Sequence, residues 1–196
     1  DIMNDALRLL AVPVIASPTE GNERARQMNA IYDRVVKGEL EKYPWYFAKK
    51  QASLAANATA PAFRFTYAYT LPADFLTLVE LRDRWVMNVA PEPTLEPDAY
   101  YERFGGELHI NDAAPLEITY ISDVSASPDL WPALFKETVS ARLAYRASNA
   151  LVKSEGMMKM MAANYDAVVV RARQSAAIQR PPTFLPSGSW THARGR

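Results

Sequence analysis

Cysteine is absent from this 196-residue sequence, and histidine occurs only twice. Without cysteine the chain can form no disulfide, thiolate nucleophile or cysteine-ligated metal site. The sequence contains no run of about 18 apolar residues and no charged-then-apolar amino terminus. We therefore expect neither a membrane-spanning helix nor a secretory signal. No glycine-rich loop precedes a Lys–Ser/Thr pair, which argues against a phosphate-binding loop. With 49% hydrophobic residues, we expect a globular protein with a sizeable core and with neither cofactor nor metal.

Charge is balanced over the whole chain, with 22 basic and 22 acidic residues, but it is unevenly distributed. Residues 72–129 contain 3 basic and 12 acidic residues, whereas residues 167–196 contain 5 basic residues and no acidic one. Oppositely charged segments on one chain can attract further copies of that chain head to tail. The alternative is that both segments are solvated surfaces that never meet.

The last 17 residues lose every helical period and become rich in Pro, Gly and Ser. Such a segment cannot build a core, yet it carries three large apolar side chains that are costly to leave in water. We therefore predict that it docks into a groove on another chain, with apolar anchors and arginines at the rim. A frayed terminus is the alternative. The residues predicted to dock are Arg180, Phe184, Leu185, Trp190, Arg194 and Arg196.

Hydrophobic periodicity predicts helices at both ends of the body of the chain. A short helix is expected over 4–10, and a longer one follows Ser17 or Thr19 as N-cap and ends before Pro44. A further short helix is expected over 45–54. After Pro128, apolar stripes along 131–151 and 157–176 predict two long helices, and their short connection predicts antiparallel packing.

Between these helices the hydrophobic period changes to two, which is typical of strands. Strands are expected over 63–68, 76–85, 107–110 and 116–122, with a turn at Gly105-Gly106. The predicted fold class is α+β, with a mainly helical body of long antiparallel helices, an inserted small antiparallel or mixed β-sheet domain and an extended C-terminal tail. The predicted parts are N-terminal helices in 1–60, the β domain in 61–128, the two long helices in 129–179 and the docking tail in 180–196.

No catalytic pattern stands out. His109 lies near Asn111 and Asp112 at the end of a predicted strand, and Ser122 could be imagined nearby, but nothing in the spacing brings them together. We interpret His109 as a structural hydrogen-bonding residue. The acidic residues of the Pro-rich stretch 90–102 fit no metal-binding loop and predict a solvated acidic loop. The protein is not expected to be an enzyme.

Several segments occur in an order that is more specific than any of them alone. They are NDALRLL (4–10), YPWYFA (43–48), YAYTLPADFLTLVEL (67–81), LEITYISDV (116–124), WPALFKETVSARLAYR (131–146) and a final long helix. Together, over about residues 3–180, they resemble the tail tubular protein A family, the head-to-tail adaptors or gatekeepers of short-tailed bacteriophages.

The resemblance implies a structural virion protein of the tail or connector, assembled in the host cytoplasm. In such a particle a homo-oligomeric ring of twelve copies lies between the portal protein and a tail nozzle protein of the tail tubular protein B type, and no membrane is involved. During ejection, DNA passes through the channel without specific binding. The tail would reach the portal or an adjacent subunit. The acidic residues expected to face the channel or the nozzle are Asp83, Glu92, Glu96 and Glu102.

A second hypothesis remains open. The basic tail, with Trp190 as an aromatic plane, also suits a DNA-binding packaging or regulatory protein. Such a protein would bind DNA with a steep dependence on salt. The acidic segment 72–129 argues against it, because carboxylates repel phosphate.

Overall fold

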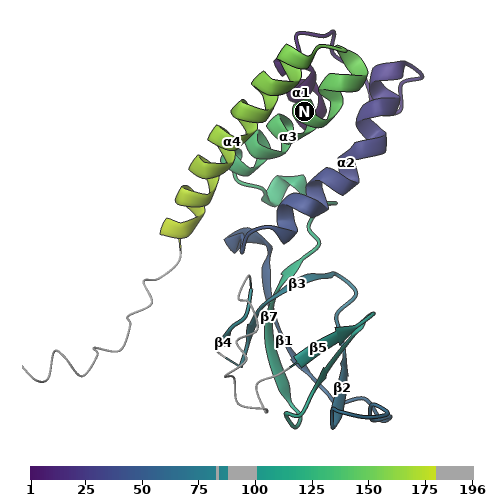
Figure 1. Ribbon diagram of the computed structural model, residues 1–196, viewed down its shortest axis with the longest axis vertical. Coiled ribbons are helices and arrows are strands. Elements are labelled where there is room, and N and C mark those ends of the chain that lie inside the picture. The colour runs from purple at the N-terminus through teal and green to yellow at the C-terminus, as the bar shows by residue number, and fades with distance from the viewer. Residues whose placement is uncertain (83, 88–100, 180–196) are drawn as a thin grey trace, which may run out of the picture.

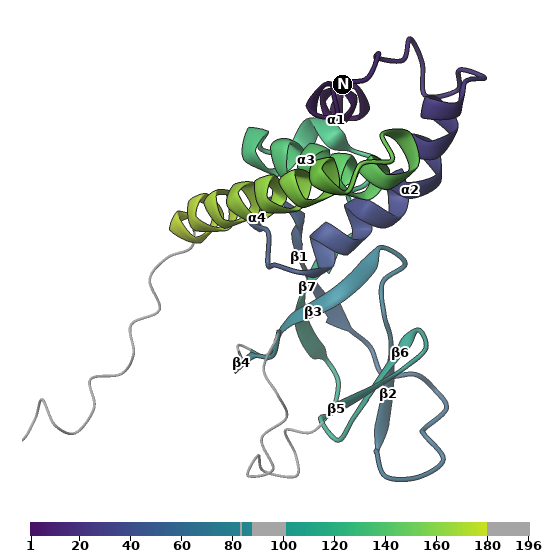
Figure 2. The same ribbon diagram turned by 45° about the horizontal axis from the view of Figure 1, so that its top comes forward.

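The computed structural model describes residues 1–82, 84–87 and 101–179. Its helices gather at one end of the molecule and its strands at the other, in both ribbon views (Figures 1 and 2). We call these the helical part and the sheet part. The helical part comprises α1 (Ile2–Leu9), α2 (Glu23–Glu41), the 3-10 helices η1 (Tyr46–Ala48) and η3 (Pro128–Leu130), α3 (Ala133–Leu151) and α4 (Glu155–Ile178).

Side-chain caps define where three of the α-helices begin, because each supplies an acceptor to a backbone amide that has no partner within the helix. α2 begins after Asn22, later than predicted, since the hydroxyls of Ser17 and Thr19 bond to each other at 2.8 Å. The capping bonds run from the Met3 amide to Asp1 Oδ1 (3.1 Å), from the Ala25 amide to Asn22 Oδ1 (2.8 Å) and from the Met157 amide to Ser154 Oγ (3.3 Å).

α3 lies at the centre of the helical part, where α1, α2 and α4 all pack against it. Its Phe135 is buried and meets Trp45 edge-on, with 4.9 Å between ring centroids. Trp131 also packs edge-on against Phe135, with 5.2 Å between ring centroids. The indole of Trp45 donates to the Glu39 carbonyl at 2.8 Å, so the buried ring leaves no polar atom without a partner.

The strands form two antiparallel sheets. One has the order β1-β7-β3-β4 and the other the order β2-β6-β5. The chain leaves the helical part through β1 and returns through β7, which pair with each other from Lys49↔Ile121 to Leu54↔Leu116. The strands are β1 (Lys49–Leu54), β2 (Tyr67–Thr70), β3 (Phe75–Leu81), β4 (Arg84–Trp85), β5 (Tyr101–Phe104), β6 (Glu107–Ile110) and β7 (Leu116–Ser122).

Two hydrophobic clusters share the sheet strands. Alternate residues of β7 enter the core of the sheet part, as the two-residue period of a strand requires. Val79 of β3 and Ile121 of β7 instead belong to the core of the helical part. The two parts are therefore connected by packed side chains as well as by the chain. The buried residues of the sheet core are Tyr69, Leu71, Leu78, Leu81, Leu108, Ile110, Leu116, Ile118 and Tyr120.

The expected architecture, a mainly helical body of long antiparallel helices with one small antiparallel or mixed sheet, is wrong. The structure is α+β with four α-helices and two small antiparallel sheets, and helices account for only 47% and strands for 20% of the residues described. The stripes along α3 and α4 were correctly located. However, α3 packs against three helices at once, so these stripes belong to a shared core and not to a separate antiparallel body.

Two local predictions also fail. Residues 45–54 form η1 and then β1 in place of a helix, because pairing with β7 overrides the helical preference of a Lys-, Gln- and Ala-containing segment. The strand expected over 63–68 begins only at Tyr67, and Phe63 is 82% exposed. The strands expected over 107–110 and 116–122 are confirmed as β6 and β7.

Candidate interaction surfaces

Most residues predicted from the sequence to make contacts lie outside the described part of the chain. This applies to Arg180, Phe184, Leu185, Trp190, Arg194 and Arg196, and to Asp83, Glu92 and Glu96. Glu102 is described: it lies on β5, and its carboxylate forms an ion pair with Arg64 Nη1 at 3.0 Å. Half of the Arg64 side chain and a third of that of Glu102 are exposed, so the pair is a surface contact that water weakens.

Other carboxylates of the sheet part are also paired within the chain. Asp74 contacts Lys50 at 2.6 Å, and the hydrogen bond from Lys50 lowers the pKa of Asp74, although burial opposes the shift. Asp123 contacts Lys37 of α2 at 3.1 Å. The cations come from residues before 72, so the acidic character of 72–129 along the sequence is partly cancelled in space.

The residues considered for catalysis do not converge. His109 Nε2 lies 3.1 Å from Glu107 Oε2, and Asn111 Oδ1 accepts hydrogen bonds from the backbone and hydroxyl of Thr66. Ser122 is buried on the other sheet, where its hydroxyl donates to the Ala48 carbonyl at 2.9 Å. Each side chain therefore has a structural partner in its own neighbourhood.

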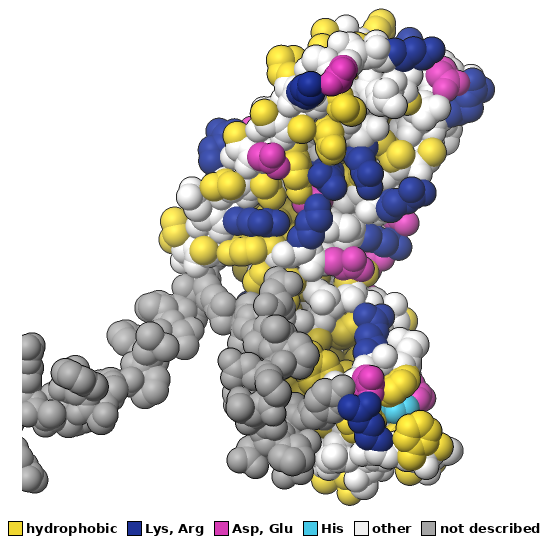
Figure 3. Space-filling model, viewed as in Figure 1, with side chains coloured by type: hydrophobic (Ala, Val, Ile, Leu, Met, Phe, Trp, Pro, Cys, Tyr) yellow, Lys and Arg dark blue, Asp and Glu magenta, His cyan; other side chains and the backbone are white. Residues whose placement is uncertain are grey.

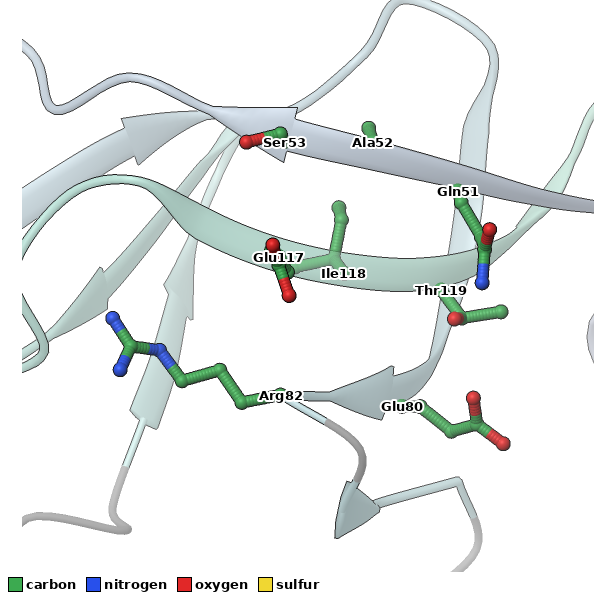
Figure 4. A pocket seen from close by; sticks show the side chains of 8 residues that line it. All are labelled: Gln51, Ala52, Ser53, Glu80, Arg82, Glu117, Ile118 and Thr119. Carbon is green, nitrogen blue, oxygen red and sulfur yellow. The ribbon is translucent and has the colours of Figure 1, made fainter.

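The outer face of the larger sheet carries a shallow polar depression of about 320 Å³ (Figure 4). The Arg82 side chain lines the depression and contacts the loop 112–115, where it donates to the Ala113 carbonyl at 2.6 Å and forms an ion pair with Asp112 at 3.4 Å. Within the described residues no group of three or more metal-binding side chains comes together, here or elsewhere. The lining residues are Gln51, Ala52, Ser53, Glu80, Arg82, Glu117, Ile118 and Thr119.

A buried ionic cluster joins three helices in the helical part. Glu39 of α2 is only 1% exposed. Its carboxylate accepts from Lys42 Nζ at 2.7 Å and from the Tyr165 hydroxyl at 2.9 and 3.0 Å, and Arg142 Nε lies 3.5 Å away. The Arg142 guanidinium also lies over the Tyr165 ring, 4.7 Å from its centroid. Burial raises the pKa of Tyr165, and the charge of Glu39 adds to the shift.

This cluster is suited to holding helices together. It contains two cations and one carboxylate, a combination that repels a metal ion. The cluster was not predicted from the sequence, although a signal was present: Glu39 follows Val35 and Val36 by four and three residues, which places a carboxylate on the buried face of α2. A buried carboxylate requires charged or hydrogen-bonding partners, and these are Lys42 at the end of α2, Arg142 of α3 and Tyr165 of α4.

Among the described residues, an apolar depression lies in the sheet part, and we call it the tip pocket. It has a volume of about 420 Å³ and is lined by Pro61, Ala62, Phe63, Arg64, Phe65, Glu102, Phe104 and His109. Phe63 and Phe104 are 82% and 48% exposed. The His109 ring packs against Phe104, with 4.6 Å between centroids. Hydrophobic side chains around the histidine are visible in Figure 3.

A second apolar depression lies where η1, the start of α3 and the end of α4 meet, and we call it the corner pocket. Its volume is about 250 Å³, and most of its walls are aromatic or apolar. It is lined by Trp45, Tyr46, Pro132, Ala133, Leu134, Phe135, Ala172, Ser175 and Ala176. Leu134, Phe135, Ala172 and Ala176 lie on the apolar stripes predicted for the two long helices, but the stripes did not predict that the packing leaves a space beside them.

Comparison of the sequence with protein-family models finds no match, and comparison with curated proteins finds none either. Among the described helices, none combines the length and the hydropathy that a membrane-spanning helix needs. The ordered sequence segments and the surfaces described above are therefore the observations that bear on function.

Proposed function

We propose that this protein is a subunit of a head-to-tail adaptor ring in a short-tailed bacteriophage. The observation that carries the proposal is the ordered set of segments from NDALRLL to the last long helix, which resembles the tail tubular protein A family. In this role the chain is a structural protein of the virion, located between a portal ring and a tail nozzle, and DNA passes along the axis of the ring.

The distribution of apolar surface supports the proposal. The tip pocket belongs to the sheet part and the corner pocket to the helical part, so the molecule offers two separate surfaces where apolar side chains of other chains can be buried. A subunit that touches both its neighbours in a ring uses different surfaces for the two contacts, as a heterologous interface requires.

The mass of the purified chain, alone and mixed with a portal protein from the same phage, tests this function. Light scattering is expected to report a small species for the chain alone and a complex of portal plus twelve chains in the mixture. A chain that ignores the portal and binds DNA with a steep loss of affinity between low and high salt would support the DNA-binding alternative.

A further inference from the structure

The corner pocket lies beside the end of α4, the last element that the structure describes. Ala172, Ser175 and Ala176 line it and belong to the final turns of this helix, which ends at Ile178. Ile178 is 82% exposed, and Leu130, just before α3, is 60% exposed. Large apolar side chains thus remain exposed on the segments that flank the pocket in sequence, which is typical of a surface that another chain covers.

The size and lining of the pocket indicate its occupant. At about 250 Å³ it lies below the range of about 300–1,000 Å³ that is usual for small-molecule sites, but it suits one or two side chains of a peptide. Trp45, Tyr46 and Phe135 contribute aromatic walls. Aromatic-lined grooves are the surfaces that recognise Pro-rich extended segments.

The start of α3 adds polar donors to the same pocket. Pro132 is the N-cap of α3 and forms no side-chain cap, so in the described part of the chain the first backbone amides of α3 are not capped by a side chain. Pro132, Ala133 and Leu134 also line the pocket. Pro132 has no N–H, and the Phe135 and Lys136 amides donate to the Pro132 carbonyl, so the donors that a peptide carbonyl would meet there are the amides of Ala133 and Leu134.

We infer that the corner pocket binds the segment around Phe184 and Leu185 from a second copy of this chain. The sequence Arg180-Pro-Pro-Thr-Phe-Leu-Pro places these two apolar residues between prolines. Prolines favour an extended backbone, which lowers the entropy lost on docking. The segment therefore matches the pocket in both its apolar side chains and its backbone.

The occupant comes from a second copy because of where the prolines stand. Pro181 and Pro182 follow almost directly after α4, and consecutive prolines disfavour helical backbone and favour an extended one, both for themselves and for the residue before them. For Phe184 to reach the pocket of its own chain, the backbone would have to reverse within residues 180–183. The inference rests on the proposed function, since it names the contact between neighbouring subunits of the ring.

A fluorescent synthetic peptide of residues 180–196, titrated with the purified full chain, tests the pocket. Saturable binding is expected, and Ala176→Leu is expected to weaken it about tenfold or more, because the added side chain fills the space that Phe184 would enter. Ala177→Leu is the matched control, since Ala177 is exposed and does not line the pocket. Equal affinities for the two variants, or no binding to the wild-type chain, would overturn the assignment.

A second pair of variants protects the test against misfolding. Ser175 is exposed and lines the pocket, whereas Gln174 is exposed and does not. Ser175→Lys places a charge at the apolar rim and is expected to reduce peptide binding about tenfold, while Gln174→Lys leaves it within twofold. Circular dichroism and thermal unfolding of all four variants verify that each remains folded. A similar loss in both Lys variants would indicate a general charge effect and contradict the proposed site.

Isotope-mixed photo-cross-linking distinguishes a second copy from the same chain. The variant Phe184→p-benzoylphenylalanine is prepared with natural nitrogen, and wild-type chain is prepared with ¹⁵N. Cross-links that join position 184 of the unlabelled variant to pocket residues of ¹⁵N chain are expected. If every cross-link to the pocket stays within the unlabelled variant and does not depend on its concentration, the pocket binds its own tail and the inference is wrong.

The two proposals can fail independently. Peptide binding and cross-linking need only this chain, whereas the adaptor function needs the portal protein. A chain that binds its own tail peptide in the corner pocket but joins no portal would contradict the function and keep the contact. A chain that forms a portal-bound ring unaffected by Ala176→Leu would support the function and contradict the contact.

Discussion

The two parts of the molecule place their charges differently. In the helical part, Glu39 is buried between three helices and is matched by Lys42, Arg142 and Tyr165. In the sheet part, ion pairs such as Lys50–Asp74 and Arg64–Glu102 lie at the surface around an apolar core. A buried ion must be paired to be tolerated, whereas an exposed pair contributes little. The same interaction therefore has different consequences in the two parts.

The largest expected effect comes from removing the buried carboxylate. Glu39→Ala leaves the mostly buried Arg142 without its ionic partner and the Tyr165 hydroxyl without its acceptor, and is expected to lower the free energy of unfolding by about 4 kcal/mol. Urea titration followed by circular dichroism measures the change. The neighbouring exposed Glu41 is the control, because Glu41→Ala is expected to change stability by less than about 0.5 kcal/mol. Similar values for the two variants would contradict the claim that a buried carboxylate contributes more to stability than an exposed one.

A smaller effect is expected from the apolar core of the sheet part. Leu108→Ala removes a side chain that is 1% exposed and should cost about 3 kcal/mol through lost burial and the remaining cavity. Hydrogen exchange is expected to speed up in β2, β5 and β6 more than in α3, because Leu108 belongs to the sheet cluster. Equal acceleration in α3 would mean that the two parts open only together.

Asp74 provides a test of a surface pair through pH. Its pKa is lowered in the folded protein, chiefly by Lys50, so the stabilisation is present above the ordinary pKa of aspartate and is lost as the pH falls through the folded value. Asp74→Asn is expected to cost about 0.5 kcal/mol at pH 7 and almost nothing at acidic pH below the folded pKa. Thermal unfolding of both proteins across this range measures the difference. A cost for Asp74→Asn that stays constant down to acidic pH would contradict the pairing.

Tyr120 shares the same carboxylate. Its hydroxyl donates to Asp74 Oδ1 at 2.9 Å, and burial, followed by this bond, raises the pKa of Tyr120 to about 12. The neutral hydroxyl is thus favoured by the fold, and its contribution to stability should be lost as the pH rises from about 10. Since the pKa of Tyr165 is also raised, in an ultraviolet titration the wild type is expected to show several late tyrosines, and Tyr120→Phe is expected to remove one of them. A titration curve unchanged by this substitution would contradict the assignment.

The smallest effect is expected at the most exposed pair. Arg64→Ala breaks the contact with Glu102, and because the Arg64 side chain is 53% exposed the loss should stay below about 0.5 kcal/mol. Thermal unfolding at low and high salt measures it, and the wild-type and variant melting temperatures should converge as salt increases. A loss of unfolding free energy above about 2 kcal/mol would contradict the surface-pair interpretation and would indicate that Arg64 holds the tip pocket in place.

Local hydrophobic periodicity predicted the elements whose own sequence carries a clear period. The apolar stripes located α3 and α4, and the period of two located β6 and β7. Residues 49–54 were wrongly predicted because their strand exists only through pairing with β7, more than 60 residues away. The number of sheets and the central place of α3 likewise depend on long-range packing, which periodicity within a single segment does not encode.

The candidate surfaces were less predictable than the elements. A carboxylate on the buried face of α2 could have indicated the Glu39 cluster, but its partners Arg142 and Tyr165 lie more than 100 residues later. The corner pocket lies where η1, α3 and α4 meet, so the sequence of any one of these segments does not predict it. The tail and most of the acidic residues predicted for contacts fall outside the described residues, and their roles remain predictions.

The most direct test of the adaptor account is to image the complex that forms when the purified chain is mixed with its portal protein. Averaged particles are expected to show twelve copies of the chain as a closed ring on one end of the portal, with an open axial channel. Portal particles that remain bare at saturating concentrations of a folded chain would contradict the account.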